Sequence, residues 1–354
     1  MSSLDFMDKL LDGVAVEWMA LSDVAEYSPT RVDAAELDAT SFVGVDNLVA
    51  DKGGRINATY LPNTERLTAY ESGDILLGNI RPYLKKVWRA TNSGGCSGDV
   101  LAVRIQDKSK SFVDSNFLYY VLSSNEFFSY SMQHAKGAKM PRGDKSAILN
   151  YRIPIPCPDN PKKSLEIQAE IVRVLDAFTE LTAELTARTK QYKHFRDQLL
   201  SFEDGSVEWK TLEHLVDINT GSKPPKIIES PTSFDYINAG TSRSGYSVAS
   251  NCEGDTVTTP SRGQGGIGYV GYQRKPFWLG PLCYKLRSID KSVLINKYLF
   301  YFLQSRSELL LGLKKEGGVP AVNKSDFVKL KIPVPTLEVQ RRIVAVLDKF
   351  DALT

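Results

Sequence analysis

The chain contains two similar copies of one sequence, one after the other. The tripeptide Val16–Trp18 returns as Val207–Trp209, and the stretch 165–178, which begins Leu-Glu-Ile-Gln, returns as 337–350. Solenoid repeats have periods of about 20 to 50 residues, much shorter than this one. Each copy is therefore expected to be a domain followed by a helix, so the chain should have two similar heads.

The two copies also match at scattered positions between these landmarks. A Gly-Asp pair at 73–74 and Arg81 are matched by a Gly-Asp pair at 254–255 and Arg262, whereas the surrounding residues differ strongly. This is the pattern of one scaffold that carries two different surfaces. It is expected if the heads recognise two different things.

The segment from Ser164 to about Phe202 is predicted to form one long helix. At 1.5 Å per residue it would span roughly 57 Å, about the length of 16 or 17 base pairs of B-DNA. An ordinary core helix is the alternative to the coiled coil that its seam indicates. The residues of the seam are spaced alternately by four and three, a heptad pattern: Ile167, Ile171, Val174, Phe178, Leu181, Leu185, Arg188, Tyr192, Phe195 and Leu199.

A second helix with the same seam is predicted from Leu337 onward, with Ser164 and Thr336 as the N-caps of the two helices. Two such helices can pair antiparallel, which would hold the two heads at opposite ends of a rod and relate them by a pseudo-twofold axis. Because Thr354 matches Thr182, the second helix is short, and we expect the end of the first helix, around Tyr192, Phe195 and Leu199, to expose apolar surface. The residues expected to pair the helices are Ile171, Phe178, Leu185, Arg188, Tyr192, Ile343 and Phe350.

A four-residue unit, Leu-Thr-Ala followed by a charged residue, occurs twice in a row at 181–184 and 185–188. One unit more or less would change the helix length by about 6 Å and rotate the chain beyond it by about 40°. The repetition is either a device that sets the length of the helix or the ordinary composition of an amphipathic helix.

Composition narrows the class of protein. The chain has no long apolar run and no signal peptide, which argues against membrane spanning and secretion and for the cytoplasm. Its four cysteines are isolated, and no His stands at metal-ligand spacing. We expect reduced, structural cysteines and no metal site.

Charge is nearly balanced overall but unevenly distributed. Residues 1–74 carry 5 Lys and Arg against 14 Asp and Glu, whereas residues 75–152 carry 12 against 5 and residues 205–335 carry 17 against 11. A solvated charged face explains such a bias as readily as a binding site does. Two basic faces on two related heads nevertheless suit phosphate binding.

Short runs that read as strands alternate with helical segments inside each head, so the predicted class is α+β. Strands are expected at 100–105 and 282–286, and helices at 117–124 and 297–304. The predicted organisation is a first head at 1–161, a spacer helix at 162–204, a second head at 205–335 and the start of a second helix at 336–354.

These features together resemble the specificity (S) subunit of type I restriction-modification systems. The resemblance covers essentially the whole chain and rests on the two variable heads, the Gly-Asp-Ile-Leu motif that leads to Arg81-Pro82, the Ile-Pro-Ile-Pro segment before the Leu-Glu-Ile-Gln helix start, and the Leu-Thr-Ala-Glu unit. The last unit is similar to that of the type IC branch. The short second helix departs from the family pattern.

The resemblance implies two target recognition domains, each reading one half of a bipartite, asymmetric sequence in double-stranded DNA. The helices would set the gap and dock two methyltransferase (M) subunits, with restriction (R) subunits joining the complex. The S subunit itself would need no cofactor, and S-adenosylmethionine, ATP and Mg would be bound by the partner subunits.

Arg, Lys, Asn and Gln side chains are the ordinary readers of base edges and phosphates. Because Arg81 and Arg262 match in the repeat, they are better candidates for scaffold or phosphate contacts than for sequence readers, and the same holds for Lys145 and Lys324. The candidates in the first head are Asn79, Arg81, Tyr83, Lys85, Lys86, Lys136, Lys139, Arg142 and Lys145; those in the second are Arg243, Arg262, Gln264, Lys314, Lys315, Asn323 and Lys324.

No catalytic constellation is apparent. Lys223-Pro224-Pro225-Lys226 lacks the polar and aromatic residues of an amino-methyltransferase motif, and the glycine-rich segment 263–268 lacks the strand, helix and acidic residue of a nucleotide-binding fingerprint. The three histidines are scattered. A non-catalytic DNA-recognition subunit is therefore favoured over a coiled-coil scaffold whose heads bind proteins, and over a stand-alone enzyme acting on nucleic acid.

Overall fold

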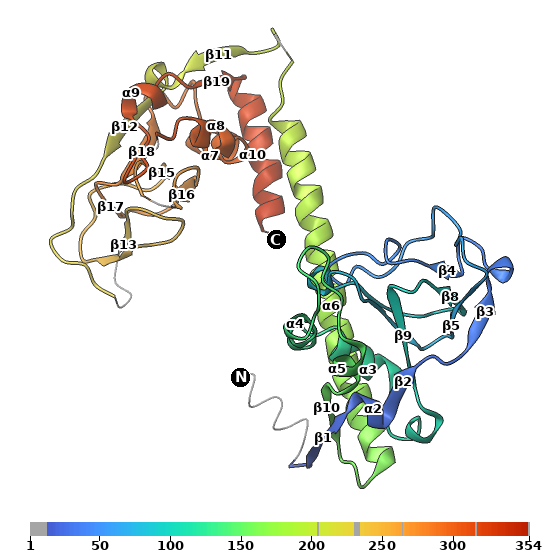
Figure 1. Cartoon of the computed structure of the whole chain (residues 1–354). Coiled ribbons are helices and arrows are strands. Elements are labelled where there is room, and N and C mark those ends of the chain that lie inside the picture. Colours follow the sequence, from blue (N-terminus) through green and yellow to red (C-terminus); the bar gives the residue numbers. More distant parts are fainter. Residues whose placement is uncertain (1–12, 204, 230–233, 264, 316, 353–354) are drawn as a thin grey trace. The chain divides into compact units, whose positions relative to one another are not determined.

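The computed structural model describes residues 13–203, 205–229, 234–263, 265–315 and 317–352. The chain divides into two compact units, Met1–Thr182 and Ala183–Thr354. Each unit combines small sheets with short helices and a segment of long helix, which confirms the predicted α+β class (Figure 1). No helix in the described ranges is long and apolar enough to cross a lipid bilayer.

The first unit contains a two-stranded ribbon and two four-stranded sheets. The ribbon joins β1 (Val16–Ala20) to β10 (Arg152–Pro156). The first sheet has the order β2 (Ala25–Tyr27), β9 (Val100–Ile105), β6 (Ile75–Gly78) and β7 (Val87–Arg89). The second has the order β3 (Arg31–Asp33), β5 (Arg66–Tyr70), β8 (Gly94–Cys96) and β4 (Phe42–Val43). Its helices are α2 (Leu21–Val24), α3 (Ser115–Leu122), α4 (Asn125–Gln133) and α5 (Lys145–Leu149).

The second unit repeats this plan in part. A ribbon of β11 (Glu208–Thr211) and β19 (Lys331–Val334) accompanies a four-stranded sheet in the order β12 (Val216–Thr220), β18 (Cys283–Ser288), β15 (Thr256–Pro260) and β16 (Gly271–Gln273). A three-stranded sheet has the order β14 (Gly245–Ser247), β13 (Phe234–Ile237) and β17 (Trp278–Leu279). The helices are α7 (Asn296–Ser305), α8 (Ser307–Gly312), α9 (Lys324–Phe327) and α10 (Leu337–Asp351). The four strand and helix predictions inside the heads are confirmed, with shifts of one or two residues at several ends.

Strand β6 shows how the sequence builds the core of the first unit. Successive side chains of a strand point to opposite faces, so Ile75 and Leu77 pack with Leu118 of α3, whereas Leu76 packs with Tyr70 of the second sheet. All of these side chains are nearly inaccessible to solvent. The first sheet is therefore buried on both faces.

The long helix α6 runs from Pro161 to Leu199 and confirms the predicted helix. It begins three residues earlier than expected because Asn160 caps it: the Asn160 side-chain oxygen accepts a hydrogen bond from the N–H of Lys163 at 3.1 Å. Proline is well suited to the first helical position. Ser164 is buried inside the helix, so its prediction as N-cap is wrong. Thr336 does cap α10, accepting from Val339 N–H at 3.4 Å.

A buried glutamine ties each long helix to its own head. In the first unit Gln168 accepts from the N–H of Asp114 at 2.9 Å and donates to the carbonyl of Phe112 at 2.7 Å. In the second, Gln340 accepts from Ile295 N–H at 2.9 Å and donates to the Val293 carbonyl at 2.8 Å. Both glutamines are fully buried. We call the two hydrogen bonds by which each of these glutamines holds its head the glutamine clasp.

A tyrosine on the head reinforces each clasp two turns along the helix. The hydroxyl of Tyr120 donates to Asp176 of α6 at 2.5 Å. The hydroxyl of Tyr301 donates to Asp348 of α10 at 2.5 Å. The repeat therefore preserves the whole polar connection between head and helix.

The far end of α6 has a partner in α10, so the predicted exposure of apolar surface is found for Phe195 but not for Tyr192 and Leu199. Phe350 of α10 contacts Tyr192 and Phe195, with ring centroids 6.1 and 5.9 Å apart, and Leu199 packs against the core of the second unit. The reason is that α10, short as it is, lies beside this end of α6 (Figure 1). Phe195 is nevertheless 38% exposed, and more strongly exposed apolar side chains lie earlier on α6, at Phe178, Leu181 and Leu185.

The other residues predicted to pair the helices have different surroundings. Ile343 is buried in the core of the second unit, and Ile171 is half-buried. Arg188 forms an ion pair with Glu184 of the same helix at 2.7 Å. Arg188 is thus held within its own helix rather than by a contact to α10.

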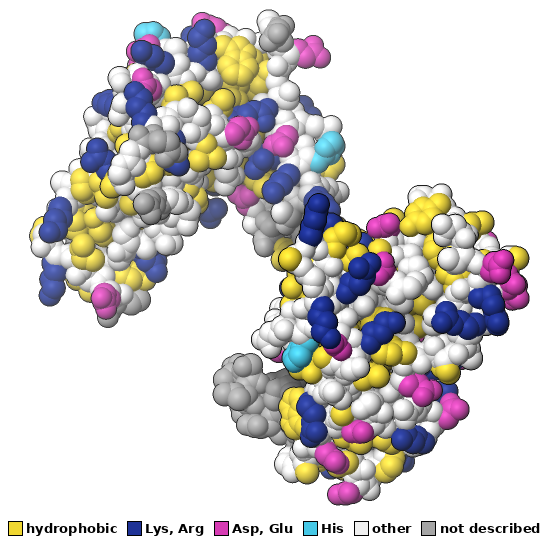
Figure 2. Space-filling model, viewed as in Figure 1, with side chains coloured by type: hydrophobic (Ala, Val, Ile, Leu, Met, Phe, Trp, Pro, Cys, Tyr) yellow, Lys and Arg dark blue, Asp and Glu magenta, His cyan; other side chains and the backbone are white. Residues whose placement is uncertain are grey.

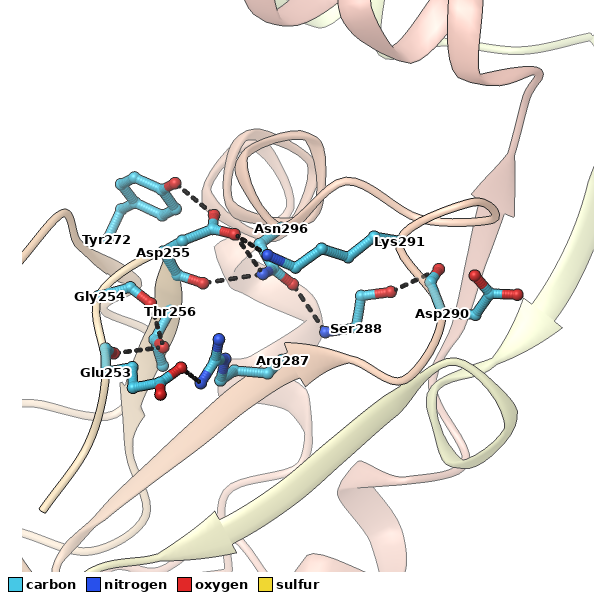
Figure 3. A network of polar contacts seen from close by, with 10 residues as sticks. All are labelled: Glu253, Gly254, Asp255, Thr256, Tyr272, Arg287, Ser288, Asp290, Lys291 and Asn296. Carbon is cyan, nitrogen blue, oxygen red and sulfur yellow. Dashed lines mark hydrogen bonds and ion pairs between the residues drawn. The ribbon is translucent and has the colours of Figure 1, made fainter.

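The repeated Gly-Asp pair anchors the sheet of each head. Asp74 forms a bidentate ion pair with Arg104, whose shortest N–O distance is 2.8 Å. Asp255 instead accepts hydrogen bonds from Tyr272 and Asn296 and forms an ion pair with Lys291 (Figure 3). The two aspartates that match in sequence therefore have different partners in the two heads.

The glutamine clasp predicts a specific loss of stability. Replacing Gln340 by Ala leaves the N–H of Ile295 and the carbonyl of Val293 without partners, which should lower the free energy of unfolding by about 3 kcal/mol. Urea denaturation of the purified chain measures this. Gln191→Ala, at an exposed position of α6, is the matched control. Equal midpoints for the two variants would contradict the account.

Candidate nucleic-acid interface

Two basic segments of the first head meet through backbone hydrogen bonds. Arg81 donates its N–H to the carbonyl of Pro141 at 2.7 Å, and Gly143 donates to the carbonyl of Asn79 at 3.0 Å. Lys136 and Arg142 exchange two further bonds of 2.9 Å. The segments 79–86 and 136–145, which the sequence suggests separately, therefore form one loop pair.

The second head builds the same loop pair from different residues. Gly263 donates to the carbonyl of Pro320 at 3.0 Å and Val322 to that of Ser261 at 2.9 Å. Lys315 and Ala321 exchange bonds of 2.9 and 3.3 Å. The backbone frame is shared by the two heads, whereas the side chains on it are not.

This frame corrects the matching of Arg81 with Arg262. Gly263, not Arg262, makes the bond to Pro320 that Arg81 makes to Pro141. The two copies are therefore out of step by one residue here. The same slip is seen where the strands begin, because positive φ falls on Gly73 in the first head and on Asp255 in the second. Arg81 and Arg262 do not occupy equivalent positions, so the repeat gives no reason to treat them as shared scaffold.

The first loop pair contains a concentration of left-handed backbone. Arg81 and Lys85 have φ of 53° and 50°, and the adjoining turn at Asp51 and Lys52 has φ of 52° and 62°. Asp51 and Lys52 donate to the carbonyls of Leu84 and Lys85 at 2.9 and 3.0 Å. Such conformations cost about 1 to 3 kcal/mol each in residues other than glycine, and they concentrate at functional sites.

Several lysines and arginines of the first loop pair already have partners. Lys136 pairs with Asp144 at 2.6 Å, and the hydrogen bond from Lys136 lowers the pKa of Asp144 to about 2. Arg142 pairs with Asp99 at 3.0 Å. Two more cations bind neutral groups: Lys85 donates to Asn125 and Lys86 to the carbonyl of Val45.

The remaining candidates of the first head differ in exposure. Arg81, Lys139 and Lys145 are exposed, and no carboxylate in the described ranges pairs with them. Tyr83 is also exposed. Asn79 is buried beneath the loops, so its side chain is not on the surface.

The candidates of the second head also differ in their partners. Lys315 pairs with Asp326 at 2.9 Å, and Lys324 donates to the side-chain oxygen of Asn219 at 3.1 Å. Arg243 lies outside the loop pair, between β13 and β14, where it pairs with Asp235 at 3.1 Å. Arg262 and Asn323 are exposed, Lys314 is half-buried, and Gln264 lies outside the described residues.

Two residues of this region are not among the candidates predicted from the sequence. Lys52 belongs to the left-handed turn beside Arg81, and Asp99 is the partner of Arg142. Lys52 lies in the acidic segment 1–74, and Asp99 is an acidic residue in the basic segment 75–152, so neither belongs to the charge pattern that marked the candidates. The turn signal Asp-Lys-Gly-Gly at 51–54 could have identified the first; nothing in the sequence singles out Asp99.

Positive charge is spread over both heads. Figure 2 shows Lys and Arg side chains distributed over the visible face of each unit, interspersed with acidic and apolar ones. The interface candidates are therefore distinguished by the shared backbone frame rather than by one uniformly basic surface.

Comparisons with known proteins agree with this arrangement of two heads. The sequence matches the family described as "Type I restriction modification DNA specificity domain" over residues 16–192 and 206–354. It is 33% identical to the specificity subunit of the type I restriction enzyme EcoR124I/EcoR124II of Escherichia coli, covering 100% of this chain and 91% of that protein. It is 30% identical to the EcoprrI specificity subunit of the same species, covering 100% of this chain and 92% of that protein.

A solved structure shares the fold. The S subunit of a type I restriction-modification system from M. genitalium superposes with a TM-score of 0.64 at 17% identity, covering 96% of this chain and 91% of that one. The protein is thus a two-headed DNA-recognition subunit rather than a catalytic one. It belongs to the family of type I restriction-modification specificity subunits, with two target recognition domains.

The left-handed turn beside Arg81 gives a prediction about stability. Lys52 has φ of 62° and an exposed side chain, so Lys52→Gly should raise the free energy of unfolding by about 1 kcal/mol, because glycine adopts this conformation without a steric cost. Lys52→Ala removes the same charge but keeps the β-carbon, and serves as control in thermal denaturation. Indistinguishable melting temperatures for the two variants would show that this turn is not strained.

Proposed function

We propose that the loop pair of each head is its DNA interface. Each head would read one half of a bipartite, asymmetric sequence in double-stranded DNA. The observation that carries the proposal is the backbone frame that the heads share while their side chains differ. A common frame gives both heads the same way of approaching DNA, and different side chains give them different sequences to read.

The charges of the loops support contact with phosphate. Arg81 and Lys139 in the first head and Arg262 in the second are exposed and have no carboxylate partner among the described residues. Cations of this kind release counterions from DNA when they bind phosphate. Lys136 and Lys315 are already neutralised by Asp144 and Asp326, and we assign them to holding the loops in shape.

The long helix is proposed to set the gap between the half-sites. The central part of α6 carries the doubled Leu-Thr-Ala unit at 181–188, whose residues are exposed. One added unit lengthens the helix by about 6 Å, equivalent to roughly two base pairs. Because this region lies outside both cores, such an insertion changes the spacing without disturbing either head.

We further propose the usual assembly for a specificity subunit of the type IC kind. Two methyltransferase subunits and restriction subunits join it in the cytoplasm. S-adenosylmethionine, ATP and Mg are bound by those partner subunits. The exposed apolar residues Phe178, Leu181 and Leu185 on α6 offer a surface for partner docking.

DNA binding by the purified chain tests the proposal. Lys139→Ala should weaken binding to all DNA sequences and reduce the slope of log affinity against log salt concentration by about 1, as expected for one lost phosphate contact. Lys108→Ala, an exposed lysine outside the loop pair, is the control. If binding is absent or insensitive to salt in the unsubstituted chain, the alternative of a coiled-coil scaffold for protein partners gains support.

A further inference from the structure

The ion pair between Asp99 and Arg142 leaves one end of the guanidinium free. Asp99 accepts from Nε of Arg142 at 3.0 Å and from Nη2 at 3.4 Å. The carboxylate therefore covers the Nε edge of the planar group. The opposite end, formed by Nη1 and the second hydrogen of Nη2, has no partner among the described residues. Arginine presents this end when it binds two acceptors side by side.

Backbone hydrogen bonds fix both members of the pair. The carbonyl of Asp99 accepts from the N–H of Asn79 at 2.8 Å, and the carbonyl of Asn79 accepts from Gly143 at 3.0 Å. Arg142 itself is bonded to Lys136 in both directions. The guanidinium is thus oriented by a carboxylate that the same frame positions, which is the preorganisation that a recognition side chain needs.

The second head lacks both members at the same places in the frame. Ser261 donates its N–H to the carbonyl of Leu282, as Asn79 does to that of Asp99. Ala321 bonds to Lys315 as Arg142 bonds to Lys136. Leu282 and Ala321 therefore stand in the second head where the first head has Asp99 and Arg142. Because exposed ion pairs contribute little to stability, the needs of the fold do not explain the presence of the ion pair in one head only.

We infer that Arg142 is a sequence reader of the first head, that it recognises a guanine, and that Asp99 is its positioning residue. The O6 and N7 atoms of guanine are adjacent acceptors in the major groove, and the free end of an arginine matches both. The second head, with Leu282 and Ala321, cannot make this contact. The inference rests on the proposed DNA interface and assigns one base in one half-site to one side chain.

Selection of bound duplexes from a randomised pool by the purified full-length chain tests the inference. In Arg142→Lys the charge is kept but the two-point contact is lost. One G·C position in one half-site should then lose roughly tenfold to hundredfold of its discrimination. The other positions and the other half-site should stay unchanged. Asp99→Asn should relax the same position with little change in overall affinity, an effect that a purely structural role would not produce.

The double variant Asp99→Leu/Arg142→Ala copies the pair that the second head already accommodates, and serves as the control for folding. It should remain folded and show the same loss at that single position. If all variants select the unsubstituted sequence, or if affinity falls equally for every sequence, Arg142 is not a base reader and the inference is overturned. If the unsubstituted chain selects no sequence at all, it is the proposed DNA interface that fails.

Discussion

The glutamine clasp is the contact on which the rest of the structure depends. A buried amide satisfies an N–H and a carbonyl of the head from within the helix, at Gln168 in one copy and Gln340 in the other. Unpaired polar groups in these places would be costly, so the helix can dock in one register only. Tyr120 and Tyr301 then fix the helix a second time through Asp176 and Asp348. A spacer can define a distance only if it is anchored in this way.

The loop pair of each head also combines a fixed backbone with variable side chains. Backbone hydrogen bonds form the frame of each loop pair, so the exposed side chains on it can change without loss of the frame. Near the Gly-Asp pair the polar contacts of the two heads also differ: Asp74 pairs with Arg104, whereas Asp255 binds Tyr272, Asn296 and Lys291. This separation of scaffold from side chains explains how one fold provides two target recognition domains with different surfaces.

The sequence predicts the parts that periodicity and repetition govern. It identified α6, the two heads and the two basic segments of each loop pair, because each leaves a local pattern. It named Tyr192 and Phe350 among the pairing residues but also expected this end of α6 to lack a partner, since only packing shows which turn of α6 meets Phe350. It did not detect the one-residue slip that separates Arg81 from Arg262, because identical letters at equal spacing suggested equivalence. The role of Asp99 depends on a contact 43 residues away along the chain.

The most direct test of the central claim is to co-express the chain with the methyltransferase subunit of its own system. The host should have no other modification system. Modified adenines are then mapped across its genome. Two different heads at the ends of one anchored helix should produce a single asymmetric motif, split by a gap of constant length. A palindromic motif would show that one head reads both halves. A continuous motif, or modification independent of sequence, would contradict the account of two heads and a spacer.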